Sequence, residues 1–219
     1  SAVVVPTLRS LDIRALDALV ISHGDNDHAG GLRGVEANIR IGKLISNRED
    51  LQTQLAVKLC SDTNDWIWDG VEFRFLHSAL DYSSENNNSC VLQIRSNEGS
   101  VLLPGDIERE AEAQLVIRYA GELASEVLVA PHHGSRSSSS YAFLKQVEPD
   151  YVVFSAGYRN SFAHPHDQVV TRYGEFASKA LSTVETGMIS FKFAKGLSGE
   201  FTEERAGDDK IIQTSEFRK

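Results

Sequence analysis

Short apolar runs alternate along this chain with segments whose apolar residues recur at helical spacing. The runs predict buried strands, because about four to eight apolar residues between turn residues are typical of a strand. Strands are predicted over residues 3–5, 18–21, 39–45, 66–68, 71–76, 90–94, 100–103, 126–130 and 151–155, and between 183 and 193. Helices are predicted around residues 8–16, 48–55 and 111–119, before residue 147, and over 168–181. This alternation indicates a layered α/β (α+β) architecture.

The composition fits one large folded domain. The chain has 219 residues, 41% of them hydrophobic and 24% charged, which is enough to bury a core in one unit or in two halves that share it. We expect residues 1–202 to form this domain and the charged, poorly patterned residues 203–219 to form a frayed tail. No apolar run approaches the roughly 20 residues of a membrane-spanning helix. We expect a soluble piece of a longer protein, because the chain starts with Ser1-Ala2 and lacks an initial Met.

Charge and cysteine content restrict the possible functions. The net charge of −9 and the pI near 5.3 give no general attraction for nucleic acid, since Lys and Arg contacts supply much of such affinity. This counts mildly against a nuclease. Cys60 and Cys90 lie outside any Cys-x-x-Cys pattern. We interpret both as small core residues, with a single disulfide as the less favoured alternative.

Residues 22–30 (Ser-His-Gly-Asp-Asn-Asp-His-Ala-Gly) directly follow the predicted strand 18–21 and concentrate possible metal ligands. Four such side chains fall within six positions: His23, Asp25, Asp27 and His28. Imidazole and carboxylate together suit zinc, manganese or iron, and pairs of ions about 3.5–4 Å apart hydrolyse phosphate esters and acyl bonds. The alternative is a polar loop in which Asp27 caps a helix that starts near Ala29. The metal site is the preferred interpretation.

Three other predicted strands end in residues that bind metals or transfer protons: Asp106, the pair His132 and His133, and His164. Because ligands gather where several strand ends meet at one edge of a sheet, we expect these residues to join the first motif. Taken singly, Asp106 fits a turn and helix cap equally well, and His164 fits an ordinary loop. His77 lies outside these loops, and we expect it to be structural.

Five motifs then occur in a characteristic order: His23-Gly-Asp-Asn-Asp27-His28-Ala-Gly-Gly, Asn87-Asn88-Ser89, Leu-Leu-Pro-Gly-Asp106, Pro-His132-His133-Gly-Ser135 and Asn160…His164-Pro165. Together they resemble the metallo-β-lactamase-fold domain of the ComEC family of bacterial DNA-internalisation competence proteins. The resemblance runs from about residue 3 to about residue 193. The ordered set is far more specific than any single motif.

The resemblance implies an αββα metallo-β-lactamase-like sandwich with two divalent metal ions (Mn, Mg or Zn) between its sheets. The family's parent protein contains a polytopic inner-membrane channel. The implied partners are therefore single-stranded DNA and the transmembrane channel portion of the same parent protein, with no organic cofactor. The implied location is the bacterial inner membrane, with this soluble domain outside the cytoplasm. The family also has two strands before the first motif, and we expect this chain to start after them.

Carried over residue by residue, the resemblance implies six metal ligands: His23, Asp25, Asp27, His28, the bridging Asp106, and His132. The wider superfamily usually has His in place of Asp25, and a carboxylate there favours manganese or magnesium over zinc. Either His132 or His133 completes the second metal position, and the sequence does not choose between them. The superfamily's separate His before the bridging carboxylate has no counterpart unless His77 or residues 87–89 replace it.

The implied activity is metal-dependent hydrolysis of phosphodiester bonds, by which the family is proposed to degrade the strand of incoming DNA that is not transported. Asp27 or Asp106 would orient the attacking water, and His133 or His164 would protonate the leaving oxygen. Four residues are candidates for contacts with DNA: Asn88, Ser89, Ser135 and Arg136. Two alternatives stay open, a metallo-hydrolase of small esters or lactams and a catalytically weak module that binds DNA or a protein partner.

Overall fold

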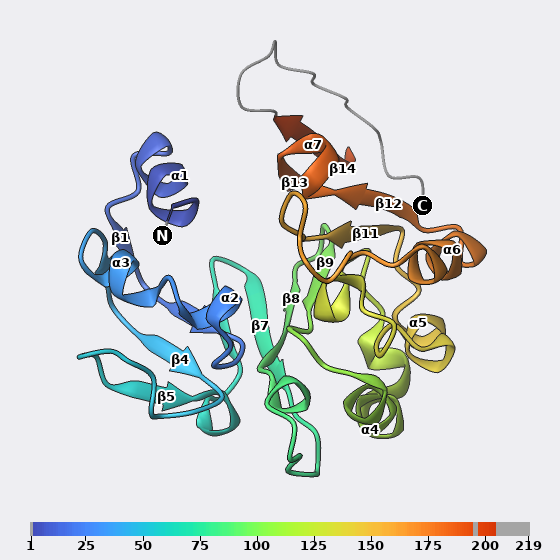
Figure 1. Ribbon diagram of the computed structural model, residues 1–219, viewed down its shortest axis with the longest axis horizontal. Coiled ribbons are helices and arrows are strands. Elements are labelled where there is room, and N and C mark those ends of the chain that lie inside the picture. Colours follow the sequence, from blue (N-terminus) through green and yellow to red (C-terminus); the bar gives the residue numbers. More distant parts are fainter. Residues whose placement is uncertain (1, 195–196, 205–219) are drawn as a thin grey trace.

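The computed structural model of this chain describes residues 2–194 and 197–204. Its largest element is a mixed sheet (Figure 1) with the strand order β12 (Lys179–Ser182), β11 (Tyr151–Phe154), β10 (Val127–Val129), β9 (Ser100–Leu103), β8 (Val91–Arg95), β7 (Val71–Leu76) and β6 (Trp66–Trp68). Strands β9 to β12 run parallel to one another, whereas β6 to β9 are antiparallel neighbours. The parallel half brings several strand ends to the same edge of the sheet, as the sequence predicted.

Within the described residues, three smaller groups of strands accompany the large sheet. A parallel sheet has the order β2 (Leu19–Ile21), β4 (Leu44–Ser46) and β5 (Val57–Leu59). Beside it are the parallel pair β1 (Ala15–Leu16) and β3 (Arg40–Ile41), and farther along the chain the antiparallel pair β13 (Met188–Ala194) and β14 (Leu197–Glu204). The β2–β4–β5 sheet places the residues that follow β2 near the centre of the molecule.

Helices cover the outer faces of the two main sheets. The large sheet packs on one side against α4 (Arg109–Tyr119), α5 (Tyr141–Val147) and α6 (Asp167–Glu175). The β2–β4–β5 sheet packs against α3 (Leu32–Glu36) through Leu32, Ile21 and Leu44. Figure 1 shows the helices on opposite sides, with the two sheets between them. This arrangement is the predicted αββα sandwich.

The residues of β8 show why the layers form. Val91 packs in the cluster under α4 and α5, whereas Leu92 packs in the cluster between the sheets with Ile45 and Phe75. Successive side chains of a strand point to opposite faces, so a strand that is apolar on both faces must be covered on both. Gln93 on the helix side is buried and donates to Glu122 O at 2.9 Å. The large sheet is therefore an internal layer.

Two predicted elements near the amino terminus are wrong. Residues 3–5 were expected to form a strand, but the helix α1 (Val4–Ser10) begins there. Val5 is buried against Val35 of α3, so tertiary packing outweighs the β preference of valine. Pro6 lies in the first helical turn, where its missing N–H removes no hydrogen bond. The helix expected as far as residue 16 ends earlier and is followed by β1.

Two predicted helices are also corrected. Residues 48–55 form no helix, and this segment connects the parallel strands β4 and β5. The Arg48 side chain pairs with Asp50 and, at 2.7 Å, with Glu85 of a distant loop. The helix expected over residues 168–181 ends at Glu175, because β12 pairs with the edge of β11. Within the segment expected to supply only late strands, α7 (Thr183–Thr186) precedes β13.

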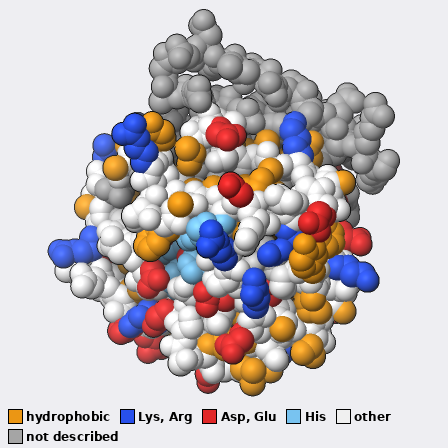
Figure 2. All heavy atoms as spheres, turned by 45° about the vertical axis from the view of Figure 1, so that its right-hand side comes forward, with side chains coloured by type: hydrophobic (Ala, Val, Ile, Leu, Met, Phe, Trp, Pro, Cys, Tyr) orange, Lys and Arg blue, Asp and Glu red, His pale blue; other side chains and the backbone are white. Residues whose placement is uncertain are grey.

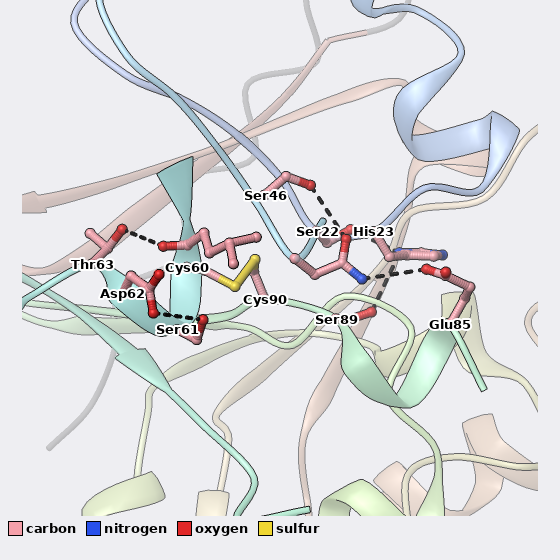
Figure 3. Close-up of a disulfide and its surroundings, with 12 residues drawn as sticks. Ser22, His23, Ser46, Cys60, Ser61, Asp62, Thr63, Glu85, Ser89 and Cys90 are labelled. Carbon is pink, nitrogen blue, oxygen red and sulfur yellow. Dashed lines mark hydrogen bonds between the residues drawn. A yellow bond between two sulfur atoms is a disulfide. The ribbon is translucent and has the colours of Figure 1, made fainter. Parts of the chain in front are cut away.

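The two cysteines form a disulfide, so the preferred interpretation of unpaired core residues is wrong in that respect. Both side chains are buried, as expected. Cys60 follows β5 and Cys90 precedes β8, and the packing of the two sheets brings their Cα atoms to 6.0 Å. That separation lies within the range that a disulfide spans. Figure 3 shows the bond beside Ser89 and close to Ser22 and His23.

No helix among residues 2–194 and 197–204 is long and apolar enough to cross a bilayer. The expected tail falls mostly on residues 205–219, which lie outside the described residues. The boundary at residue 202 stays a prediction, and β14 extends to Glu204.

Candidate metal centre

The loops that follow four strands meet at one place on the molecule. They follow β2, β9, β10 and β11, and they carry His23, Asp106, His133 and His164 respectively. Figure 2 shows histidine side chains gathered on one face, bordered by basic, acidic and apolar side chains. The predicted convergence of strand ends is therefore present in the structure.

Four side chains could hold a metal ion together. One ligand atom from each of Asp27, His28, Asp106 and His133 lies within 4.8 Å of the others. Asp106 Oδ1 is 3.2 Å from His28 Nε2, and Asp106 Oδ2 is 3.4 Å from His133 Nε2. Asp27 Oδ2 is 3.3 Å from His133 Nε2. This mixture of imidazole and carboxylate donors suits zinc, manganese or iron.

Two further possible ligands, His23 and Asp25, lie near the same carboxylate of Asp106. His23 Nε2 is 3.9 Å from Asp106 Oδ2 and 3.6 Å from Asp25 Oδ2. His23 is fully buried, and its Nε2 has no hydrogen-bond partner among the described residues. A buried polar atom without a partner costs free energy, and a cation shared with Asp25 and Asp106 would remove that cost. His23 and Asp25 are therefore further candidates, with Asp106, to hold a metal ion.

Local backbone geometry explains the glycines beside these ligands. Gly105 has φ +62°, and a Cβ there would lie 2.8 Å from Ser89 Cβ and 2.9 Å from Ser22 Cβ. Because Gly105 has no Cβ, Asp106 can approach the loops that carry Ser22 and Ser89, beside His23. Gly134 has φ +85°, and a Cβ there would lie 2.8 Å from Pro165 Cβ. Only glycine fits both positions without displacing a neighbouring loop.

His132 and His133 adopt an uncommon backbone conformation. Their φ angles are +49° and +54°, in the left-handed region that is costly for residues with a side chain. The turn is held by a hydrogen bond from His132 N to Gly105 O (3.1 Å) and by one between His133 Nδ1 and Ser155 O (2.7 Å). Such strain persists where the surroundings determine the conformation. Here it turns His133 Nε2 towards Asp106.

The electrostatic environment favours a positive charge between the carboxylates. Burial by itself raises the pKa of Asp106, but hydrogen bonds and charges of His133 and His28 together hold that pKa well below its usual range. The hydrogen bond to Asp106 raises the pKa of His133 to about 9, although burial acts in the opposite direction. Burial and the neighbouring His28 lower the pKa of His23. The proton on His133 thus supplies positive charge beside the Asp106 carboxylate.

Ser22 supports two ligands and was missed as a functional residue. Its Oγ is 3.1 Å from His23 Nδ1 and 2.9 Å from His28 Nδ1. A hydroxyl oxygen has two lone pairs, so it can accept from both Nδ1–H groups and leave both Nε2 atoms free for metals. The signal in the sequence was a hydroxyl residue immediately before the first motif. The carbonyl of Ser155, at the end of β11, supports His133 in the same way.

His132 and His164 lie at the border of the cluster. His132 Nε2 is 3.9 Å from Asp106 Oδ2, and its Nδ1 is 3.5 Å from Glu108 Oε1. The His164 ring is 5.7 Å from that of His132 and 6.3 Å from that of His133, measured between centroids. Burial, with His132 and His166 nearby, lowers the pKa of His164 to about 4. The structure thus brings His164 to the site but outside the group of four donors.

The candidate substrate residues occupy different environments. Ser89 is buried, accepts from Asp106 N at 3.1 Å and lies 3.4 Å from His23 Nδ1. Asn88 uses its side chain to bind the backbone of Tyr82, at 3.0 and 2.7 Å. Ser135 bonds to Ser137. Arg136 is exposed. Of these four residues, Ser89 contacts two of the expected metal ligands, Asp106 and His23.

His77 lies apart from the cluster, as expected of a structural residue. Its backbone N–H donates to Tyr119 Oη (3.0 Å), which donates in turn to His77 O (3.3 Å). Burial and the charge of Arg118 lower its pKa. Among the described contacts, residues 86–89 approach His23 and His132 instead: Ser89 reaches His23, and Asn86 Nδ2 is 3.5 Å from His132 Nε2.

A buried carboxylate anchors the loop after His133. Glu112 of α4 accepts hydrogen bonds from the backbone N–H groups of Ser139 and Ser140. Arg172 of α6 donates to Ser138 O at 3.1 Å. Sequence reasoning missed Glu112, because an acidic residue early in a helix is ordinarily a solvated partner of the helix dipole. The anchor positions the serine-rich segment beside the metal centre.

Comparison with known proteins agrees with this geometry. The family model described as "Metallo-beta-lactamase superfamily" matches residues 5–158. The chain belongs to the metallo-beta-lactamase superfamily. Among solved structures, the metallo-beta-lactamase fold protein YhfI from Bacillus subtilis matches with a TM-score of 0.49 and 11% identity, covering 76% of this chain and 74% of YhfI.

Several curated relatives of this metallo-beta-lactamase domain are named for competence or recombination. Competence protein ComA of Neisseria gonorrhoeae is 38% identical over 194 residues, which are 88% of this chain and 28% of ComA. Recombination protein 2 of Haemophilus influenzae is 33% identical, covering 81% and 22%. ComE operon protein 3 of Bacillus subtilis is 29% identical, covering 91% and 27%. The expected superfamily and the resemblance to competence proteins are confirmed, and the chain spans about a quarter of these relatives.

Proposed function

We propose that this domain is a metal-dependent phosphodiesterase that cleaves a strand of DNA during DNA uptake. The observation that carries the proposal is the group Asp27, His28, Asp106 and His133, whose ligand atoms lie within 4.8 Å. Paired cations held in this way are a common device for hydrolysing phosphate esters. The substrate class rests on the relatives, one of which is named as a competence protein. Both steps together make DNA the substrate to test first.

We assign one cation to Asp27, His28, His133 and Asp106, and a second to His23, Asp25 and Asp106. When bound, such cations activate a water for attack and neutralise negative charge on a phosphate. Asp25 in place of a second imidazole favours manganese or magnesium at the second position. The distances favour His133 over His132 as the ligand, so the roles expected for these two residues are exchanged in this proposal.

His132 and His164 then have roles at the reacting oxygen atoms. Glu108 Oε1, 3.5 Å from His132 Nδ1, orients the imidazole and leaves Nε2 on the side of Asp106. His132 is therefore placed to donate a proton to the leaving oxygen. His164, whose pKa is lowered to about 4, is neutral near pH 7. A neutral imidazole is suited to accept a hydrogen bond next to His132.

The disulfide supports a location outside the cytoplasm. Structural disulfides form and persist in oxidising compartments such as the periplasm and the cell surface. Cys60 and Cys90 are both buried and bonded to each other. We therefore place the domain on the extracytoplasmic side of the inner membrane, attached to the transmembrane channel portion of its parent protein. Single-stranded DNA is its proposed partner there.

The test is cleavage of single- and double-stranded DNA with added manganese, magnesium or zinc. Asp106→Ala and Asp27→Ala should each reduce cleavage at least 100-fold, since each removes a carboxylate from the cation cluster. His77→Ala, outside the cluster, is the matched control and should keep most of the activity. Absence of DNA cleavage with all three metals, together with faster hydrolysis of a small ester or lactam, would contradict the proposal. Absence of any hydrolysis would favour a binding module.

A further inference from the structure

The loop between β11 and α6 carries two large aromatic side chains that the hydrolytic site does not use. Tyr158 is 74% exposed and Phe162 is 71% exposed. Exposure of two such rings in one short loop is unusual, because aromatic side chains ordinarily contribute to a core or an interface. The position of the loop, next to the metal centre, suggests what the rings bind.

Phe162 connects this loop to the histidines. Its ring stacks on that of His164, with 5.7 Å between centroids and 24° between planes. His164 in turn contacts the ring of His132, whose Nε2 lies 3.9 Å from Asp106 Oδ2. The exposed ring of Phe162 is therefore linked to the histidine cluster through His164. A cavity of about 480 Å³, lined in part by Arg159, Asn160 and His164, lies beside the loop.

Hydrogen bonds within the loop fix its conformation. Asn160 accepts from His164 N at 2.8 Å and donates to His164 O at 2.7 Å, so its side chain closes the loop. Arg159 and Ala163 have φ angles of +54° and +55°, which persist only where the surroundings impose them. Binding to a preformed loop loses less conformational entropy than binding to a loop that must first become ordered.

The positive charge of Arg159 beside Tyr158 is a second feature suited to binding a nucleic-acid strand. The Arg159 guanidinium lies over the Tyr158 ring, with Cζ 5.2 Å from the ring centroid, and Arg159 is exposed. An aromatic ring beside an exposed guanidinium is the combination that proteins use to stack a base and hold its phosphate. Because the net charge of the chain is −9, counterion release offers limited affinity. Stacking supplies affinity that does not depend on net charge.

We infer that Tyr158 and Phe162 form a platform on which bases of a single strand stack next to the metal centre. The inference rests on the proposed function and specifies its substrate as a strand with unpaired bases, since only those offer their flat faces to a ring. The platform would hold the strand while the phosphate between neighbouring nucleotides lies at the histidines. Arg159 would contact the backbone of the same strand.

The test compares two probes that share a backbone and differ in bases. The fluorescence anisotropy of a labelled 12-nucleotide oligothymidylate and of a 12-unit abasic strand is measured with the whole chain and excess chelator, so that neither probe is cleaved. The wild type should bind oligothymidylate more tightly, by roughly 5- to 150-fold for one stacked base. The variant Tyr158→Leu/Phe162→Leu should lose this preference. Trp68→Leu, which removes an exposed ring (48%) on the β6–β7 hairpin, should retain it.

Each outcome separates the platform from the nuclease. Equal binding of both probes by the wild type, or a preserved preference in the double variant with an unchanged melting temperature, would overturn the platform. In that case, metal-dependent DNA cleavage by the wild type would leave the proposed function standing. A base preference that depends on the two rings, without cleavage in any metal, would support the platform and contradict the nuclease. Absence of both the base preference and the cleavage would contradict both the platform and the nuclease.

Discussion

Reduction of the Cys60–Cys90 disulfide should lower the free energy of unfolding by about 3.6 kcal/mol. The two residues are 30 positions apart, and the chain-entropy relation for a loop of that size gives about 12 cal/mol/K, or about 3.6 kcal/mol at 25 °C. For a chain of 219 residues, this corresponds to a fall of roughly 7–14 °C in the temperature of thermal unfolding. The loss arises mainly in the unfolded state, which gains freedom once the loop is opened.

Reduction is the cleanest form of this perturbation, because both sulfur atoms stay in the core with Ile45, Phe75 and Leu92. No cavity is created, so the loop constraint is the principal change. The assay is urea unfolding of the wild type with and without a phosphine reductant, with thiol titration to establish complete reduction. The variant Cys60→Ala/Cys90→Ala is the control and should not respond to the reductant. A loss below about 1 kcal/mol in fully reduced protein would refute the reasoning, since the loop relation would then not govern this chain.

Two further predictions concern single side chains. Ser22→Ala should weaken metal binding by about 10–100-fold, since His23 Nδ1 and His28 Nδ1 lose their common acceptor. Competition with a chromophoric chelator measures the metal affinity. Unchanged affinity in Ser22→Ala would exclude this supporting role. Burial and the charge of Arg118 lower the pKa of His77 below its ordinary value of 6.5. The neutral His77 side chain therefore stabilises the fold above pH 6.5. This stabilisation is lost as the pH falls, because the unfolded state takes up the proton first. The unfolding free energy of His77→Gln should therefore decrease less than that of the wild type between pH 7.5 and pH 5, and identical decreases would contradict this account.

The elements that the sequence predicted correctly are those whose apolar pattern agrees with their packing. Val127 to Val129 is a continuous apolar run, and Val91 to Arg95 is apolar at three of its five positions. Both are interior strands of the large sheet. The elements that failed depend on distant partners. Val5 is helical because it packs against α3, and residues 179–182 form a strand because the edge of β11 is available for pairing.

The sequence by itself determined the superfamily of this protein and its candidate metal ligands. The order of its motifs indicated the superfamily, and the position of Asp106 and His133 after strands predicted that they would meet, because parallel strands bring their ends to one edge. His23 follows β2 of the other sheet, so the packing of the two sheets brings it to the same place. Only the tertiary structure decided which atoms meet. It selected His133 over His132 for the group of four donors, joined the two cysteines and placed Ser22 between two histidines. These choices depend on backbone angles and on distances of a few ångströms between loops far apart in the chain, and a one-dimensional pattern does not contain them.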